Sequence, residues 1–215
     1  MDPVLILYLN EGSGTTAYDR SGLNNHGTIY NPIWVQKWID WFLYFDGQSD
    51  YVLIPDNDSI NPLKEMTILM WVYPVTDMYG GGTWTCLRKG NNQYLIEPGD
   101  VGTNYWAFGV NIGGTFYRVD TTSALPINQW IQIGGRFSSS LGRIDIIVNG
   151  SVNNTRSVSG TIQRQSGGLY LGKWGGEIFK GYIGEVLMFS RYLPDDQIKF
   201  FANIFRGELR KPPSF

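Results

Sequence analysis

Oxygen-bearing side chains gather in one glycine-bounded loop near the start of the chain. Asp19 is followed by Asn24, Asn25, His26 and Gly27. Calcium takes about six to eight oxygen ligands, and this loop offers a carboxylate, two amides and several backbone carbonyls. The same side chains can instead hydrogen-bond their own backbone in Asx-turns. The loop is therefore a candidate calcium site or a self-satisfied turn, and His26 is expected to lie in the loop without ligating the ion, because calcium prefers oxygen.

Flat aromatic side chains form a second group with possible chemistry, because the C–H faces of sugars pack against them. Sugar sites are apolar clefts with a few fixed polar groups. Trp174 lies between Lys173 and Gly175 in a predicted loop and is the best candidate for an exposed ring. Trp84 follows a glycine-rich stretch and is expected at a rim. Burial in the core is the alternative for each aromatic residue and is expected for most of them. Polar neighbours that could complete a groove are Arg88, Lys89, Asn91, Asn92, Glu97 and Arg118.

The titratable residues do not form the patterns that common enzymes need. A retaining glycosidase places two carboxylates about 5.5 Å apart. The chain has one histidine, His26, and one cysteine, Cys86, so a histidine-rich zinc site, a redox cysteine pair and a catalytic triad are not predicted. The carboxylates considered for catalysis are scattered singly: Glu97, Asp100, Asp120, Asp145, Glu177 and Glu185. We therefore predict that the protein is not an enzyme.

The composition indicates the scaffold that positions these side chains. The chain has 215 residues, of which 15% are aromatic, 17% are charged and 27 are glycine. Abundant glycine, aromatic and β-branched residues with few charges are typical of an all-β fold. A net charge of −2 gives no basic footprint for nucleic acid. No segment approaches the roughly 18 apolar residues of a membrane span, and Met1 to Val4 lacks the basic region of a signal peptide.

Short apolar runs separated by Gly, Asn, Pro and Ser clusters predict strands at the spacing of a β-sandwich. Phe42 to Asp46 and Tyr51 to Ile54 flank the turn Gly47 to Asp50, which predicts a hairpin. Thr67 to Tyr73 is apolar on both faces, as a central strand would be. The insert from Ile33 to Phe42 suits either a short amphipathic helix or a strand at a sheet edge.

One helix is predicted near the C-terminus. Pro194 to Gln197 opens it with proline and acidic residues in the first turn, and Gly207 closes it. Ile198, Phe201, Ala202 and Phe205 share one face. No linker or repeat interrupts the chain, so we predict a single domain over residues 1–215 with an extended tail at 211–215.

An ordered series of short motifs runs along nearly the whole chain. The series is Tyr18-Asp19-Arg20-Ser21-Gly22, Asn24-Asn25-His26-Gly27, Phe45-Asp46-Gly47, Ile68 to Pro74, Gln129-Trp130, Val148-Asn149-Gly150, Leu169-Tyr170-Leu171-Gly172 and Gly181-Tyr182-Ile183-Gly184-Glu185-Val186. This order and spacing resemble the laminin-G-like jelly-roll domains of the concanavalin A-like lectin and glucanase superfamily. The resemblance implies an antiparallel jelly-roll sandwich of two sheets with one short C-terminal helix. It also implies non-catalytic recognition of carbohydrates or surfaces, often with a structural calcium ion.

The resemblance also implies where the calcium ligands and the ligand-binding residues lie. In this family the loop aspartate and an acidic residue near the last strand converge on calcium, which corresponds to Asp19 and Glu185 here. Asn25 and the backbone of His26 or Gly27 would assist, and Asp46 is a further candidate. Gly184 stands where the family usually has aspartate, so one possible ligand is missing. The middle strands of the concave sheet would carry Tyr94, Trp106 and Tyr117, beside Trp84, Arg118 and Trp174.

Three functions from different classes follow. The first is a non-catalytic, lectin-like module that binds a glycan or cell-surface polysaccharide. The second is a structural or decoration protein on the surface of a virion or similar assembly. The stretch Phe201 to Arg206 resembles the ending of such domains in phage and other viral genomes, and the apolar insert would serve contacts with capsid proteins or a homo-oligomer. The third is a glycosidase or polysaccharide lyase. The expected location is extracellular or on a virion.

Overall fold

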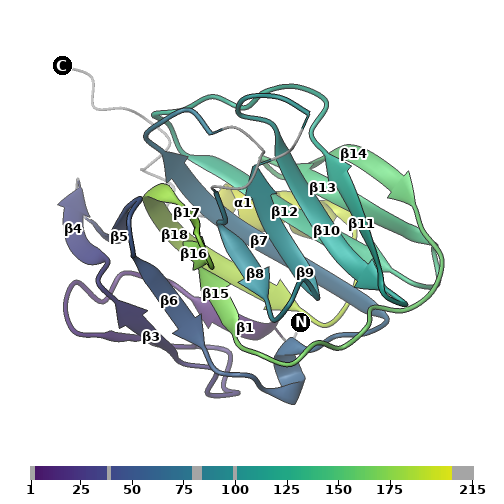
Figure 1. Cartoon of the computed structure of the whole chain (residues 1–215), viewed down its shortest axis with the longest axis horizontal. Helices are drawn as coiled ribbons and strands as arrows, with labels where there is room; N and C mark the ends of the chain where they lie inside the picture. Colours follow the sequence, from purple (N-terminus) through teal and green to yellow (C-terminus); the bar gives the residue numbers. More distant parts are fainter. Residues whose placement is uncertain (1–2, 38–39, 79–83, 99–100, 205–215) are drawn as a thin grey trace.

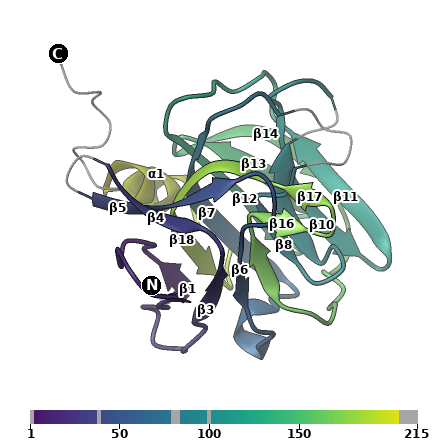
Figure 2. The same cartoon turned by 60° about the vertical axis from the view of Figure 1, so that its left-hand side comes forward.

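The computed structural model describes residues 3–37, 40–78, 84–98 and 101–204, which form two antiparallel sheets packed face to face (Figure 1, Figure 2). The all-β jelly-roll sandwich with one short C-terminal helix, predicted from the sequence, is confirmed. The predicted tail at residues 211–215 lies outside the described residues. In the part of the chain that the structure describes, no helix has the length and apolar character needed to cross a membrane.

The first sheet, sheet A, has β7 and β18 at its centre. One edge of β18 pairs with β7, while its other edge pairs first with β5 through residues 180–183 and then with β1 through residues 186–189. A bulge at Gly184 and Glu185 separates these halves. The strands of sheet A are β1 (Pro3–Leu7), β4 (Ile33–Lys37), β5 (Asp40–Asp46), β7 (Glu65–Pro74), β12 (Ile131–Ser138), β13 (Arg143–Val148), β14 (Ser151–Ser157) and β18 (Lys180–Phe189).

The second sheet, sheet B, runs in the order β11-β10-β9-β8-β15-β6-β3-β2. Its strands are β2 (Thr16–Ala17), β3 (Gly27–Tyr30), β6 (Tyr51–Ile54), β8 (Leu87–Lys89), β9 (Tyr94–Pro98), β10 (Trp106–Ile112), β11 (Thr115–Asp120) and β15 (Leu169–Leu171). A small hairpin of β16 (Lys173–Trp174) and β17 (Glu177–Ile178) follows β15 directly, and a 3-10 turn, η1 (Asp58–Ile60), follows β6.

The core lies between the two sheets because alternate residues of each strand point inward. On β7, Met66, Ile68, Met70 and Val72 belong to the main core cluster. The other face of β7 is also apolar, and there Leu69 is buried in a second cluster on the outside of sheet A. The prediction that residues 67–73 form a central strand with two apolar faces is therefore confirmed.

The helix α1 (Asp195–Ile204) covers part of the outer face of sheet A (Figure 2). Its buried residues are Ile198 and Ala202, and Phe201 packs beside them, as predicted from their spacing. Asp195 and Asp196 lie in its first turn, where carboxylates are favoured by the helix dipole. The remaining predicted features of this helix, Phe205 and Gly207, lie outside the described residues.

The predicted hairpin between residues 42–46 and 51–54 is wrong. β5 pairs with β4 and β18 in sheet A, whereas β6 pairs with β15 and β3 in sheet B. The turn between them carries the chain from one sheet to the other, and Asp50 fixes it by accepting a hydrogen bond from the backbone N–H of Asp46 at 2.7 Å. The apolar insert forms strands β4 and β5, so the strand-edge alternative holds for its described residues.

Candidate functional site

Strand alternation gives the outer face of sheet B a different character from its inner face. On β6, Val52 and Ile54 are buried in the core, so Tyr51 points outward. On β15, Leu169 and Leu171 point inward and Tyr170 points outward. Arg88 of β8 pairs directly with Tyr170, so the ring and the guanidinium share this outer face. Aromatic and charged side chains therefore meet at the middle of the sheet.

An open pocket of about 420 Å³ lies on this face. We call it the aromatic pocket, and it is lined by Tyr51, Tyr170, Lys173, Trp174 and Gly175. Strand β6 contributes the first tyrosine, β15 the second, and the β16–β17 hairpin the remaining three residues. A cleft lined by aromatic rings and one cation suits a small ligand that has both an apolar face and polar groups.

A glycine makes the sharp connection from β15 to the β16–β17 hairpin possible. Gly172 has a φ of +86°, and a Cβ atom there would lie 2.4 Å from the ring of Phe45. Any other residue would both strain the backbone and clash with the core. The turn at Gly172, packed closely on Phe45, brings the β16–β17 hairpin beside β8 (Figure 2). Trp174 lies on this hairpin.

The rings of the pocket hold one another in fixed orientations. Tyr51 stacks on Tyr30 with a centroid distance of 4.5 Å and an interplanar angle of 13°. Tyr170 meets Trp174 edge to face at 5.1 Å. Such pairs contribute about 0.5–1.5 kcal/mol beyond area burial. Burial and the neighbouring Tyr30 and Tyr170 raise the pKa of Tyr51, so its hydroxyl stays neutral and available as a donor.

A charge cluster flanks the pocket on the β8 and β9 side. Arg88 forms ion pairs with Glu97 at 2.5 Å and with Glu177 at 2.8 Å. Thr85 also donates a hydrogen bond to Glu177. Burial raises the pKa of Glu97 although Arg88 opposes this shift. The guanidinium of Arg88 lies 5.9 Å from the centroid of the Trp174 ring, so the charge cluster also packs against the indole.

Lys173 differs from Arg88 because it forms no ion pair with any described residue. Its Nζ lies 5.7 Å from the centroid of the Tyr51 ring. The nearby carboxylate, Asp50, is buried and bonded to the backbone of Asp46, and it does not line the pocket. The ammonium group of Lys173 is therefore the charge that the pocket presents.

Two of the predicted binding residues lie in the core. Tyr94 and Trp106 are 0% and 1% exposed, and both belong to the cluster between the sheets. The Tyr94 hydroxyl donates to the carbonyl of Ile60 at 2.8 Å. The prediction that these two rings contact a ligand is wrong, because β9 and β10 turn them inward and turn Leu95 and Gly109 outward.

The other predicted binding residues lie at different places. Trp174 lines the aromatic pocket. Trp84 and Tyr117 are half-buried and pack against the core cluster. Arg118 lies on the outer face of sheet B at β11, which three strands separate from β15 and Tyr170, and it pairs with Asp120 at 2.7 Å. The structure therefore does not bring these residues into one site with Trp174.

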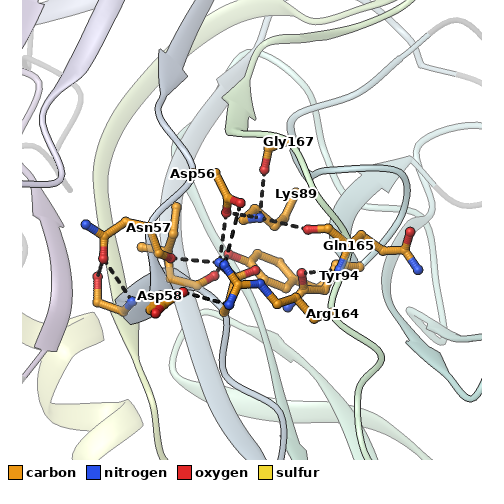
Figure 3. Close-up of polar contacts among 12 residues, drawn as sticks. Asp56, Asn57, Asp58, Lys89, Tyr94, Arg164, Gln165 and Gly167 are labelled. Carbon is orange, nitrogen blue, oxygen red and sulfur yellow. Dashed lines mark hydrogen bonds and ion pairs between the residues drawn. The ribbon is translucent and has the colours of Figure 1, made fainter.

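Lys89, which the sequence suggests as a polar groove residue, is a fully buried structural residue. Its Nζ bonds Asp56 at 2.8 Å and the carbonyls of Gln165 and Gly167 at 3.3 and 2.7 Å (Figure 3). Burial lowers the pKa of Lys89, and the hydrogen bond to Asp56 opposes this shift. The same bond holds the pKa of Asp56 below its usual range. Lys89 thus ties two loops together at the end of β8, and Arg164 adds a bond to Asp58 (Figure 3).

The Asp19 loop has the contacts of the Asx-turn alternative. Asp19 is 6% exposed, and its Oδ1 accepts the backbone N–H groups of Ile6 and Ser21 at 3.0 and 2.8 Å. Its Oδ2 accepts the Ser21 hydroxyl at 2.7 Å and the Asn25 backbone N–H at 2.9 Å. A carboxylate has about four lone-pair sites, and four protein donors fill them. His26 accepts the Asp19 backbone N–H through Nδ1 at 2.9 Å and so also supports this loop.

The other predicted calcium ligands do not complete a cage. Asn25 donates to the carbonyl of Val4 and to Ser59, which leaves its buried Oδ1 as a single oxygen without a hydrogen-bond donor. Asp46 accepts the backbone N–H of Gln48 in another turn. Glu185 is half-buried at the bulge of β18. The described residues include no group of three or more His, Cys, Asp and Glu side chains placed to hold a metal ion. This arrangement does not fit a calcium site, and calcium stays a prediction.

Sequence reasoning missed the two tyrosines that form the floor of the pocket. Tyr51 and Tyr170 occupy outward positions of short strands whose other residues are buried aliphatics. That alternation was visible in the sequence. What it lacked was the pairing of β6 with β15, which places the two tyrosines beside each other.

The chain matches a family described as the Concanavalin A-like lectin/glucanases superfamily (Laminin_G_3) over residues 46–199. This match covers most of the chain, and the protein therefore belongs to that family. No curated protein shows a significant sequence match.

Several solved structures share the fold. The binding domain of Paraclostridial Mosquitocidal Protein 1 has a TM-score of 0.74 and 14% identity, over 94% of this chain and 52% of that one. Domain 4 of AbnA, an extracellular arabinanase from Geobacillus stearothermophilus, was solved in complex with arabinotriose. It has a TM-score of 0.73 and 17% identity, and the match covers 94% of this chain and 98% of that one. The receptor binding domain of botulinum neurotoxin C/D mosaic serotype has a TM-score of 0.73 and 12% identity, and the match covers 94% of this chain and 51% of that one. The chain thus spans about half the length of the toxin domains. The first and third of these neighbours are binding domains.

Proposed function

We propose that the protein is a non-catalytic, lectin-like module that binds a glycan of an extracellular or cell-surface polysaccharide in the aromatic pocket. The observation that carries this proposal is the meeting of Tyr51, Tyr170 and Trp174 around an open cleft on the outer face of sheet B. Aromatic faces pack against sugar C–H groups, while the phenol hydroxyls and the Lys173 ammonium bind sugar hydroxyls.

The neighbouring structures support the same class of ligand. Domain 4 of AbnA was solved with arabinotriose, and it matches this chain over almost its whole length. The toxin domains are receptor-binding domains. The carboxylates of the neighbouring charge cluster, Glu97 and Glu177, both pair with Arg88 and are used structurally. Among the described residues, these contacts do not favour a glycosidase or lyase reaction.

A tryptophan substitution tests this proposal. Trp174→Ala removes one of the three rings that line the pocket and should reduce glycan affinity at least about tenfold, equivalent to about 1.4 kcal/mol. Binding is measured by calorimetry after a glycan array with plant, microbial and host glycans. Phe200→Ala is the matched control, because this ring is 52% exposed on α1 at the other sheet. Equal binding by wild type and Trp174→Ala, or no binding to any glycan, would contradict the proposal.

A second candidate function is a subunit of a surface assembly, such as a decoration protein on a virion. The observation that favours it is the outermost strand of sheet A, β4, which carries Ile33 at 59% exposure and half-buried Trp34 (Figure 1). An exposed apolar edge strand is a template for pairing with another chain. The two functions are compatible, because the aromatic pocket lies on the other sheet. Light scattering tests this candidate.

A further inference from the structure

Three cations lie on or beside the outer face of sheet B, and their partners differ. Arg88 is bound by Glu97 and Glu177. Arg118 is bound by Asp120. The charges of these two arginines are therefore matched by protein carboxylates at 2.5–2.8 Å. Lys173 has no such partner among the described residues.

The position of Lys173 directs its charge into the aromatic pocket. Lys173 and Trp174 are the two residues of β16, and both line the pocket. The Lys173 ammonium group lies on the Tyr51 side at 5.7 Å from that ring, while Trp174 contacts Tyr170 on the other side. No acidic residue lines the pocket, although the buried carboxylate of Asp50 interacts electrostatically with Lys173 from outside it. A ligand that fills the pocket therefore meets three aromatic rings and one half-buried cation.

We infer that the pocket selects an acidic saccharide, whose ring packs on Trp174 and Tyr170 and whose carboxylate or sulfate binds Lys173. This inference rests on the proposed glycan-binding function and adds the chemical class of the sugar. A sugar hydroxyl can hydrogen-bond the ammonium, but a carboxylate or sulfate adds the attraction of an opposite charge, which is stronger in a partly buried site than in water. A lysine accommodates either anion because its ammonium is a compact charge with three donors.

Matched pairs of saccharides test the inference, with calorimetry as the readout. One pair is trigalacturonate and its fully methyl-esterified form, which have the same sugar rings and differ in that each carboxylate is replaced by a neutral methyl ester. A second pair is a 6-sulfated lactosamine oligomer and its unsulfated parent. Arabinotriose is the neutral reference. We expect the wild type to bind at least one anionic member about tenfold more tightly than its neutral partner, and less tightly as salt is added.

Substitutions then assign the preference to Lys173. Lys173→Gln should abolish the anionic preference while weak binding of the neutral partner remains, and Lys173→Arg should keep the preference. Lys199→Gln, which removes an equal charge from the exposed surface of α1, is the matched control and should change nothing. Thermal melting establishes that each variant is folded.

The outcomes separate this inference from the proposed function. Equal affinity for both members of each pair, lost on Trp174→Ala, would overturn the acidic preference and leave glycan binding in place. A preference that survives Lys173→Gln would overturn the role of Lys173. Absence of binding to every probe would overturn both the glycan function and its acidic specificity.

Discussion

Asp19 is a buried carboxylate that accepts four hydrogen bonds, all of them from donors of the protein itself. Two backbone N–H groups bind one oxygen, and a hydroxyl and a third backbone N–H bind the other. These bonds join the loop to β1 through Ile6. A calcium ion would have to displace donors that are already well placed, and would leave buried N–H groups without acceptors.

We therefore expect calcium to leave the thermal midpoint of the EDTA-treated wild type unchanged. Asp19→Ala should lower that midpoint by the same amount with and without millimolar calcium, because it removes acceptors from Ile6, Ser21 and Asn25. Differential scanning fluorimetry measures both effects, with Asp46→Ala as a control in a less buried turn. A ligand at about 100 times its dissociation constant adds about 2.7 kcal/mol, or roughly 5–10 °C here. A rise of that size, abolished by Asp19→Ala, would instead establish the calcium site.

Single residues of the candidate site were predictable to different degrees. Trp174 was found because lysine and glycine neighbours indicate a loop, and it lines the pocket. Tyr94 and Trp106 were assigned to the wrong face, although strand alternation puts Glu97 and Asn111 of the same strands on the opposite, outer face. The buried role of Lys89 depends on carbonyls more than 70 residues away in the chain, which no local pattern reveals.

At the scale of elements, helix α1 and the turn before it are anchored to sheet A by a buried carboxylate. Asp145 of β13 is 0% exposed and binds Arg136 at 2.7 Å and the Tyr192 hydroxyl at 2.6 Å. Arg136 in turn donates to the carbonyl of Leu193 and pairs with Asp195 at the helix start. The helix is therefore held by polar contacts at its N-terminus and by apolar packing along its length.

The same carboxylate makes stability depend on pH. Burial raises the pKa of Asp145, but hydrogen bonds from Tyr192, Thr155, Arg143 and Arg136 together outweigh burial and hold the pKa below the usual value of an aspartate. A folded-state pKa below the unfolded value means that the carboxylate stabilises the fold above the unfolded pKa. This contribution is lost as the pH falls through the folded-state pKa.

Asp145→Asn should therefore cost about 3 kcal/mol of unfolding free energy at neutral pH, because it leaves the buried Arg136 without its buried carboxylate partner and only with the exposed Asp195. The difference in unfolding free energy between wild type and variant should narrow as the pH falls through the folded-state pKa, because the wild-type carboxylate then also becomes protonated. Urea unfolding at neutral and at acidic pH measures this difference. Asp120→Asn, a half-exposed carboxylate paired with Arg118, should cost about 0–1 kcal/mol. A difference in unfolding free energy between wild type and Asp145→Asn that stays constant with pH would contradict the assignment of this pH dependence to Asp145.

Most strands were predictable because alternation and turn residues are local signals. Strand partners were not, and the turn at residues 47–50 shows why. Its glycine and polar residues would suit a hairpin, yet Leu43 pairs with Ile183 and Val52 pairs with Leu171. These partners lie more than 110 residues away, and packing in the core decides between the two arrangements. The helix was predicted because its capping proline, acidic first turn and apolar spacing all act within one segment.

At the scale of the whole molecule, the two outer faces have different characters. Sheet B presents the aromatic pocket, whereas sheet A is covered in part by α1 and ends in the exposed strand β4. A glycan face and an assembly edge could therefore operate together without competing for the same surface.

If β4 is an assembly edge, the protein should form a specific oligomer in solution. Ile33→Lys should convert that oligomer to a monomer, because a charged residue on an edge strand disfavours pairing. Multi-angle light scattering measures the mass of each species. Leu141→Lys is the matched control, since both side chains are 59% exposed and Leu141 lies in a turn between β12 and β13. A monomeric wild type at high micromolar concentration would exclude this assembly.

The pairing of β18 with β1 and β7 has a consequence for how the protein is made. The centre of sheet A joins residues 65–74 to residues 180–189, and β1 joins the same strand from residues 3–7. On the ribosome, β1 and one edge of β7 must wait without their partner until the chain has been translated through residue 189. Folding dominated by such distant contacts is slow, on the order of milliseconds to seconds. The apolar strand β7 is therefore a natural target for chaperones during synthesis, and premature truncation before β18 should yield aggregates, not a smaller folded domain.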